Sequence, residues 1–327
     1  MQNEESINFT TRHDLTALQL KIETLKAEMA KCLVGQTQMA ELLLTAILAD
    51  GHVLIEGVPG IAKTLTAKLL ARTISTNFSR IQFTPDLMPS DVIGTSIFNP
   101  ASGDFIFRKG PVFSNIVLID EINRAPAKTQ SALFEVMEER QISYDGVTYP
   151  LGFPFLLLAT QNPVDHEGTY RLPEAQLDRF MFKIDITYPS AAEELQILEL
   201  QSNNTPNQLG SVQPVLHPEE ISEFRKLAAE VHIEPRLKEY IVSIVGATRN
   251  HPFLYLGASP RASLALMHAS KALATLRGKD FIVPEDIQEL AFPVLRHRII
   301  LSPEKEMEGL NNDEVIRQII RKIEVPR

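Results

Sequence analysis

The stretch Gly57-Val58-Pro59-Gly60-Ile61-Ala62-Lys63-Thr64 decides how the rest of this sequence is interpreted. An apolar run at residues 52–55 precedes it and predicts a short buried strand. Leucines at 65, 69 and 70, among Ala and Lys, predict a helix directly after it. Strand, glycine-rich turn and helix are together the parts of a phosphate-binding loop.

The residue types in this loop fit the binding of a nucleotide. Small residues let backbone amides close around an anion, and the N-terminus of the following helix adds the positive end of its dipole. Lys63 supplies a mobile positive charge, and Thr64 supplies a hydroxyl for Mg²⁺. The usual pattern has a second glycine where this chain has Ala62, so we expect this position not to need a positive φ. The predicted nucleotide-binding residues of the loop are Gly57, Val58, Pro59, Gly60, Ile61, Ala62, Lys63, Thr64 and Leu65.

A second anchor is the pair Asp120-Glu121, which follows the apolar run 116–119. That run predicts a buried strand, and ligands of open α/β sheets bind at the carboxyl ends of the strands. One carboxylate can hold Mg²⁺, and the next can polarise a water toward the γ-phosphate. Such a pair alone is more often only a strand end, but a position ~55 residues after a phosphate-binding loop makes it specific.

Composition sets the broad class of the protein. A length of 327 residues predicts two domains, and 44% hydrophobic with 22% charged residues is ordinary globular composition. A net charge of −9 disfavours broad nucleic-acid binding. Cys32 is the only cysteine, so no intramolecular disulfide forms. The sequence shows neither a signal-peptide pattern nor an apolar run of about 20 residues, so we expect a soluble, cytoplasmic protein without a membrane span.

The order of predicted elements gives an α/β domain at 1–189 and a smaller, all-helical domain at 190–327. The predicted strands of the first domain lie at 52–55, 81–83, 116–119, 155–160 and 182–186. Its predicted helices lie at 15–31, 39–48 and 127–140, with a short one after Pro89. The predicted helices of the second domain lie at 219–229, 235–249, 260–277, 285–295 and 313–322, after a surface loop at 201–213.

Two hairpins interrupt the α/β pattern. One pairs residues 95–98 with 105–107, and the other turns at Asp145-Gly146 within residues 142–149. The apolar residues of the first hairpin either form a tip that touches a partner or pack on their own domain. The sequence leaves both interpretations open.

Three further candidates have an ordinary interpretation beside the functional one. Val34-Gly35-Gln36 is either a plain inter-helix turn or a contact for adenine. Asn162 is either a turn residue before Pro163 or an amide that reaches the attacking water. Arg179 is, by base rate, a surface charge.

The motifs together resemble the AAA+ ATPases, and among them the MoxR subfamily. The segments on which this resemblance is based lie between residues 34 and 300, in the order expected for the family. They are the octapeptide above, Phe83-Thr84-Pro85-Asp86-Leu87, Asp120-Glu121-Ile122-Asn123-Arg124-Ala125-Pro126, Ala159-Thr160-Gln161-Asn162-Pro163, Leu172-Pro173-Glu174-Ala175-Gln176-Leu177-Asp178-Arg179-Phe180 and Gly257-Ala258-Ser259-Pro260-Arg261.

The resemblance implies a P-loop NTPase core of AAA+ type, followed by a helical lid, that hydrolyses ATP to ADP and phosphate. By position, Lys63 and Thr64 would bind phosphates and Mg²⁺, Asp120 would support the metal, and Glu121 would be the general base. Asn162 falls on sensor 1, and Arg261 falls on sensor 2, reaching the γ-phosphate from the second domain. Residues 34–36 match the adenine-side turn, and the hairpins match the helix-2 and pre-sensor-1 inserts.

Arg179 falls on the arginine-finger position, which implies a ring, most simply a homo-hexamer. Such a finger acts on the nucleotide of the neighbouring subunit. The family association further implies a chaperone-like remodeller for maturation of metalloenzymes or protein complexes, with a protein client and a von Willebrand A domain partner.

Two other functions remain as alternatives at this point. An MCM-related nucleic-acid motor would share both hairpins, but residues 95–107 and 142–150 contain no Lys or Arg to track a phosphate backbone. A regulatory nucleotide sensor that does not hydrolyse ATP is disfavoured by the intact pair Asp120-Glu121.

Overall fold

The computed structural model describes residues 15–326 apart from 59–61, 102, 163–171 and 203–207. Its centre is a five-stranded sheet in the order β2-β5-β8-β1-β9, and every neighbouring pair of strands is parallel. The strands are β1 (Val53–Gly57), β2 (Phe78–Gln82), β5 (Ile116–Asp120), β8 (Leu156–Gln161) and β9 (Phe182–Ile186). The α/β core with a parallel sheet is therefore confirmed.

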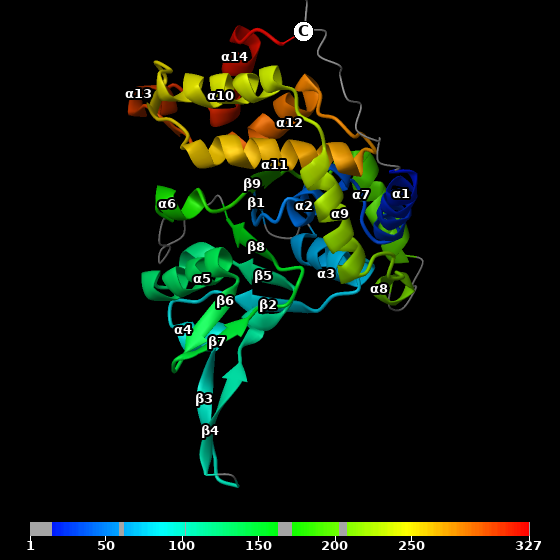
Figure 1. Cartoon of the computed structure of the whole chain (residues 1–327), viewed down its shortest axis with the longest axis vertical. Helices are drawn as coiled ribbons and strands as arrows, with labels where there is room; N and C mark the ends of the chain where they lie inside the picture. Colours follow the sequence, from blue (N-terminus) through cyan, green and yellow to red (C-terminus); the bar gives the residue numbers. More distant parts are fainter. Residues whose placement is uncertain (1–14, 59–61, 102, 163–171, 203–207, 327) are drawn as a thin grey trace, which may run out of the picture.

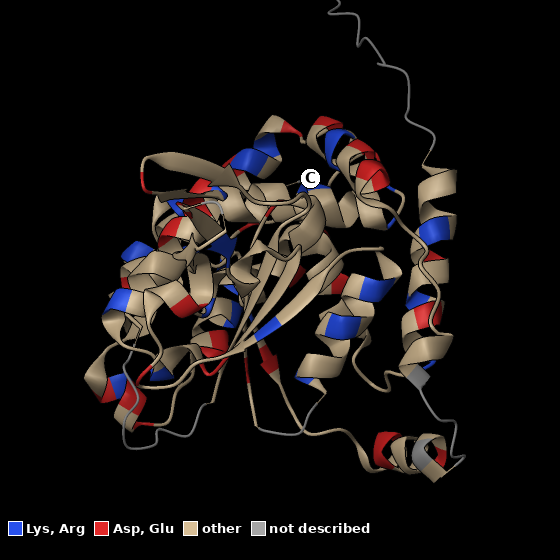
Figure 2. Cartoon of the chain, turned by 90° about the horizontal axis from the view of Figure 1, so that it is seen from below, with Lys and Arg blue, Asp and Glu red and all other residues tan. Residues whose placement is uncertain are grey.

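Both faces of this sheet are buried, as parallel sheets require. Odd and even residues of a strand face opposite sides, so Val53 and Ile55 of β1 belong to one hydrophobic cluster and Leu54 to the other. The first cluster includes residues of α1 (Thr16–Ala30), α2 (Thr37–Leu48) and α3 (Lys63–Thr73), and the second those of α5 (Ala127–Glu139). Charged residues colour mainly the helices and loops around the sheet, whose strands are mostly uncharged (Figure 2).

The carboxyl-terminal part is mainly helical, as predicted. Its helices are α7 (Ala191–Ser202), α8 (Gln208–Ser211), α9 (Pro218–Glu230), α10 (Pro235–Arg249), α11 (Pro260–Leu276), α12 (Pro284–Leu295), α13 (Pro303–Met307) and α14 (Asn312–Lys322). Proline opens several of them because the first helical position needs no N–H donor.

Two expectations for this part are wrong in detail. Strands β10 (Leu254–Leu256) and β11 (Ile300–Leu301) form a small antiparallel sheet, so the lid is not purely helical. Helix α7 was not predicted, and α8 lies within the expected loop 201–213. A capping box at Ser190 and Glu193 was the available sequence signal for α7. In the structure, the Ser190 N–H donates to the Glu193 carboxylate, and the Glu193 N–H donates to the Ser190 hydroxyl.

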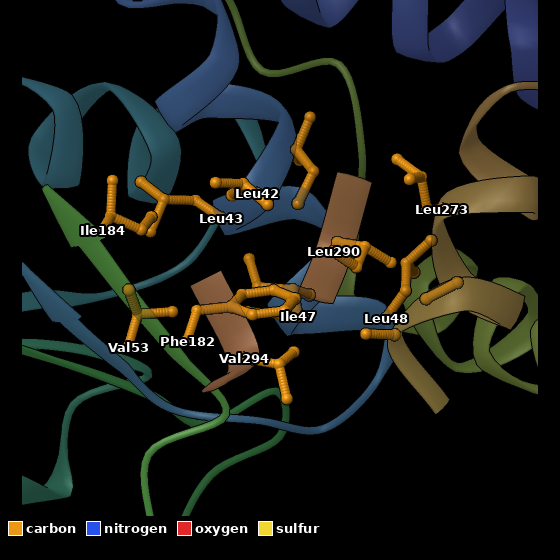
Figure 3. Close-up of a cluster of buried hydrophobic side chains, with 14 of the residues drawn as sticks. Leu42, Leu43, Ile47, Leu48, Val53, Phe182, Ile184, Leu273, Leu290 and Val294 are labelled. Atoms are coloured by element: carbon orange, nitrogen blue, oxygen red, sulfur yellow. The ribbon is translucent and has the colours of Figure 1, made fainter. Parts of the chain in front are cut away.

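One continuous core joins the sheet to the lid. Figure 3 shows Phe182 of β9 among Ile47 of α2 and Val294 of α12, with Leu290 and Leu273 of the lid close by. This cluster contains residues from both sides of the predicted domain boundary at residues 189/190. The position of that boundary stays a prediction. In Figure 1 the helices α10, α11 and α12 lie beyond one end of the sheet, on the side opposite the long hairpin.

The two predicted hairpins are confirmed, and they are packed on each other. They are β3 (Gly94–Asn99) with β4 (Asp104–Lys109), which follow α4 (Pro89–Ile93), and β6 (Gln141–Tyr144) with β7 (Val147–Pro150). Asp145 and Gly146 have positive φ angles of 49° and 76°, as a two-residue hairpin turn requires.

The first hairpin packs on its own domain at its base, which is one of the two interpretations that the sequence left open, and contact of its end with a partner stays a prediction. Near its base, the Phe107 ring lies 4.6 Å from the Tyr149 ring and 4.9 Å from the Tyr144 ring, centroid to centroid. Toward its end, Phe98 and Phe105 are 51% and 71% exposed. The β3–β4 ribbon extends away from the rest of the chain (Figure 1), so its base packs on the second hairpin while its end faces solvent.

Stability should depend on pH through His52, which directly precedes β1 and is buried. Its Nδ1 accepts from the Leu157 N–H (3.0 Å), so Nε2 carries the proton that it donates to the Met137 carbonyl (3.1 Å). Burial, and then the charge of Arg140, lower the pKa of His52 well below its usual range. The folded protein therefore holds a neutral ring, whereas the unfolded chain takes up a proton below about pH 6.5.

We predict that the free energy of unfolding falls as pH falls from 7.5 to 5.5, with about 1.4 kcal/mol of the loss due to His52. Urea unfolding of wild type and His52→Gln at both pH values measures this contribution. His52→Gln should show the smaller pH dependence, and an equal dependence in the two proteins would contradict it.

Candidate active site

A cavity of about 460 Å³ lies at the carboxyl ends of β1, β2, β5 and β8. Its size is within the range of small-molecule sites. The lining residues come from segments far apart in the sequence. They are Gly57, Ala62, Lys63, Thr64, Leu65, Arg80, Gln82, Asp120, Glu121, Thr160, Gln161 and Asn162. Of the loop residues predicted to bind nucleotide, Val58 packs against the core, and Pro59, Gly60 and Ile61 lie outside the described residues.

Ala62 corrects one expectation from the sequence. It precedes α3 with φ 56° and ψ 16°, in the left-handed region, so the position does adopt the positive φ that a glycine would take there without strain. A residue with a Cβ pays roughly 1–2 kcal/mol for this conformation. Ala62 adopts this conformation as the N-cap residue of α3, directly before Lys63.

The Lys63 side chain is directed toward the end of β1. Its ammonium group donates to the Gly57 carbonyl, and it lines the same cavity as Asp120 and Glu121. Burial lowers the pKa of Lys63, and the charges of Asp120, Glu56 and Glu121 oppose that shift. The ammonium therefore lies at the strand ends where a phosphate would meet it.

Asp120 ends β5 and is bound on both carboxylate oxygens. Oδ1 accepts from the Thr160 hydroxyl (3.2 Å), and Oδ2 accepts from Arg80 Nε (2.5 Å). The adjacent Glu121 has a positive φ of 57°. Its Oε2 accepts from Gln82 Nε2 (2.7 Å) and Arg124 Nη1 (3.1 Å), so Arg124 pairs within its own chain.

The donor set of this cavity suits a magnesium–nucleotide complex. Thr64 and Asp120 offer hard oxygen donors beside Lys63. Within residues 15–326, as far as the structure describes them, no group of three or more His, Cys, Asp or Glu forms a cage for a metal. Magnesium in phosphoryl-transfer sites is held by one or two protein oxygens, with phosphates and waters completing the shell, so these residues fit it.

A second, smaller cavity of about 220 Å³ includes two of the three residues predicted on the adenine side. Gly35 and Gln36 line it together with the end of β9, where Ile186 pairs with Gly57 of β1. Gly35 has φ 75°, a left-handed conformation that glycine adopts without strain, so the turn favours glycine. Val34 directly precedes this turn. The two cavities are therefore next to each other along the same edge of the sheet.

Arg179 and Arg261 are brought together by one carboxylate. Arg179 Nη1 lies 2.8 Å from Glu138 Oε2, and Arg261 Nη2 lies 3.0 Å from Glu138 Oε1. Neither arginine lines the cavity that contains Lys63. The structure thus places the finger and sensor-2 candidates side by side at the end of α5, and Asn162 in the cavity with Lys63.

A buried ion pair, Asp178 with Arg298, lies behind these arginines, and no pattern in the sequence indicated it. Asp178 Oδ1 accepts from Arg298 Nε (2.8 Å), and Asp178 Oδ2 accepts from the Ser259 hydroxyl (2.8 Å). The Arg298 side chain is 3% exposed and also donates to the Phe180 carbonyl (2.5 Å). Since Asp178 directly precedes Arg179 and Ser259 caps the helix that carries Arg261, this network fixes both arginines relative to the lid.

Arg80, Gln82 and Thr160 are the site residues that sequence reasoning missed. Arg80 and Gln82 alternate along β2 and therefore project from the same face of that strand. Polar residues at alternating positions near the end of a strand were the available signal. Nothing in the sequence pointed to Arg298.

Comparison with known proteins agrees with this geometry. Residues 52–182 match the family described as ATPase family associated with various cellular activities (AAA), and residues 246–319 match the AAA lid domain. The chaperone MoxR1 of Mycobacterium tuberculosis is 44% identical over 92% of this chain and 81% of its own length. This chain belongs to the MoxR family of AAA+ ATPases.

Other MoxR relatives and a solved structure cover most of the chain. The protein MoxR of Methylorubrum extorquens is 31% identical over 90% of this chain and 91% of its own. A crystal structure from Cytophaga hutchinsonii matches with a TM-score of 0.90 and 46% identity, over 96% of this chain and 97% of that chain.

The family membership confirms the ATPase activity and the AAA+ core with its lid that the motifs predicted. These matches do not support the alternative of an MCM-related motor. In the part of the chain that the structure describes, no helix is long and apolar enough to cross a bilayer.

The buried pair behind the MoxR arginines gives a stability prediction. Asp178→Asn leaves the Arg298 guanidinium buried with a neutral partner, so it should lower the free energy of unfolding by about 3 kcal/mol. Glu138→Gln is the matched control, because it alters a half-exposed carboxylate and should cost about 1 kcal/mol or less. Urea unfolding compares the two variants, and equal losses would contradict the role given to Asp178.

Proposed function

We propose that this MoxR protein works as a ring, a homo-hexamer, in which ATP hydrolysis drives remodelling of a client during maturation of metalloenzymes or protein complexes. The main support for this proposal is that the cationic residues implied to act on the phosphates lie at two separate sites of one chain. Lys63 lies in the cavity with Asp120 and Glu121, whereas Arg179 and Arg261 lie together on Glu138. A site completed by a second copy accounts for that division.

Within one subunit, the cavity provides for binding and for activation of water. Lys63 would bind the β- and γ-phosphates, and Thr64 and Asp120 would hold Mg²⁺, which neutralises charge on the transferred phosphoryl group. Glu121 would be the general base. Because Gln82 and Arg124 both bind its Oε2, Oε1 is the oxygen that would accept a proton from the attacking water. Asn162 would help to position that water.

The turn at residues 34–36 would receive the adenine. Gly35 and Gln36 line the cavity beside the end of β9, next to Gly57. A nucleotide lying along this edge would place its base at Gly35 and its phosphates at Lys63.

Between subunits, Arg179 would act on the nucleotide of a neighbour. Because Arg261 shares Glu138 with Arg179 and does not line the cavity that contains Lys63, we propose that Arg261 also acts on the neighbour, in place of the sensor-2 role toward its own nucleotide that the resemblance implies. Guanidinium groups bind carboxylate and phosphate oxygens in similar ways, so the shared contact with the Glu138 carboxylate supports the proposal that both arginines would hold one phosphate. Asp178, next to Arg179, is bound to Ser259 and Arg298 of the lid, which also carries Arg261. Both arginines would therefore approach the neighbour from the same side.

The hairpins would contact the client or a partner with a von Willebrand A domain. Phe98, Phe105 and Ile106 near the end of the first hairpin are all at least half exposed. Arg108 and Lys109 belong to β4 but lie at its base, away from these residues. Exposed apolar groups without nearby cations suit a protein surface better than a phosphate backbone.

Substitution of the proposed base should separate binding from hydrolysis. Glu121→Gln should bind ATP as wild type does and lose at least about 10²-fold in turnover, because a neutral amide cannot take the proton. Phosphate release and binding of a fluorescent ATP analogue measure the two effects. Normal phosphate release by this variant would reject Glu121 as the base.

Mixing of two inactive variants tests the shared site. Arg179→Ala should bind ATP and lose about 10³-fold in turnover, and Lys63→Ala should lose turnover because it no longer grips the phosphates. In mixed rings, Lys63→Ala subunits would supply Arg179 to Arg179→Ala neighbours, so activity should return. The double variant Lys63→Ala/Arg179→Ala is the matched control and should restore none. A mixture that co-assembles without regaining activity would contradict a finger supplied by the neighbour.

A further inference from the structure

Arg80 is a cation of the cavity whose role the proposed mechanism leaves open. It lies on β2, two residues before Gln82, and lines the cavity with Lys63 and Thr64. Its Nε is 2.5 Å from Asp120 Oδ2. The side chain of Arg80 is 52% exposed and that of Asp120 is 12% exposed, so a solvent-accessible cation covers a largely buried carboxylate.

The two contacts of Asp120 differ in how easily they can be exchanged. Thr160, on Oδ1, is 4% exposed, and its hydroxyl also accepts from the Glu121 N–H (3.1 Å), which fixes it in place. Arg80, on Oδ2, reaches in from the edge strand β2 and can turn toward water. Oδ2 is therefore the oxygen that a metal ion, or one of its bound waters, can gain at Asp120.

Both adjacent carboxylates have a cationic partner, but β2 supplies only one of them. Arg80 of β2 contacts Asp120, whereas Gln82 of β2 gives Glu121 a neutral amide donor and Arg124 supplies its cation. Removal of Arg80 therefore changes the charge at Asp120 and leaves the ion pair of Glu121 in place.

We propose that Arg80 is an internal counter-ion that competes with Mg²⁺ for Asp120 Oδ2. This inference rests on the proposed role of Asp120 in holding the metal. Without metal, Arg80 neutralises Asp120, so the triphosphate meets less repulsion from the carboxylate. When Mg²⁺ binds, Arg80 leaves Oδ2. By linkage, Arg80 weakens the binding of Mg²⁺ and reduces the dependence of ATP binding on the metal.

Nucleotide binding, measured without turnover, tests this role. The full chain would be titrated with a fluorescent, non-hydrolysable ATP analogue, first in EDTA and then at rising Mg²⁺ concentration. Arg80→Met should lower the Mg²⁺ concentration at half-maximal binding by about 3- to 10-fold, the range of a modest ion pair. In EDTA it should bind the analogue more weakly than wild type, because Asp120 then repels the phosphates.

Lys68→Met is the matched control, because it removes one cation from an exposed position on α3, over the Phe78 ring and outside the cavity. It should leave the Mg²⁺ midpoint unchanged. In an Asp120→Asn background, Arg80→Met should cause no further change in the Mg²⁺ midpoint, because the carboxylate for which Arg80 and Mg²⁺ compete is then absent.

An unchanged or raised Mg²⁺ midpoint in Arg80→Met would overturn the inference about Arg80. In that case, a change of the Mg²⁺ midpoint in Asp120→Asn would still support the proposed role of Asp120 in holding the metal. If Asp120→Asn leaves the Mg²⁺ dependence as in wild type, the proposed role of Asp120 fails, and that of Arg80 fails with it. Weaker analogue binding by Arg80→Met in both EDTA and Mg²⁺, with the midpoint unmoved, would make Arg80 a phosphate ligand instead.

Discussion

The parallel pairing of β1 with its two neighbours is the constraint on which the rest of this structure depends. Because β1 lies between β8 and β9, and β8 lies beside β5, the carboxyl ends of these strands meet at one edge. Hydrogen bonds fix the register, so residues at the strand ends have little freedom to lie elsewhere. Asp120, which ends β5, and Asn162, which follows β8, therefore line one cavity with Lys63, which begins α3, although about a hundred residues separate Lys63 from Asn162.

Charged groups at this edge and at the end of α5 are paired with partners in the same chain. Asp120 is bound by Arg80, Glu121 by Arg124, and Arg179 and Arg261 by Glu138. Uncompensated charges near a buried sheet would be costly, so such partners keep the site formed. In the proposed function, ligand binding would exchange these partners rather than create new charge pairs. That exchange would make the affinity for a nucleotide sensitive to residues that never touch it.

The lid is coupled to the site through packing as well as charge. The cluster around Phe182 continues from the sheet into α11 and α12, and Asp178 is held from the lid by Arg298 and Ser259 (Figure 3). A displacement of the lid therefore has to carry the segment of Arg179 with it. In the proposed ring, this connection would transmit the nucleotide state of one subunit to the next.

Much of this architecture follows from local patterns in the sequence, and the exceptions have physical causes. The apolar run before Asp120 and the proline-led helices of the lid are local signals, and the structure confirms them. The Asp178–Arg298 pair joins residues 120 positions apart, so no local pattern marks it. Ala62 misleads because it adopts a left-handed backbone as the N-cap residue of α3, against the preference of alanine. Arg80 was hidden because an exposed arginine on an edge strand is ordinarily a solvated charge.

The most direct measurement of the central idea, a nucleotide site shared between copies of the chain, is the specific ATPase activity of wild type over a wide range of protein concentration, with the assembly state followed in parallel. The account predicts that activity per chain falls steeply where the assembly dissociates, while nucleotide binding persists. A constant activity per chain down to concentrations at which only monomers remain would contradict it.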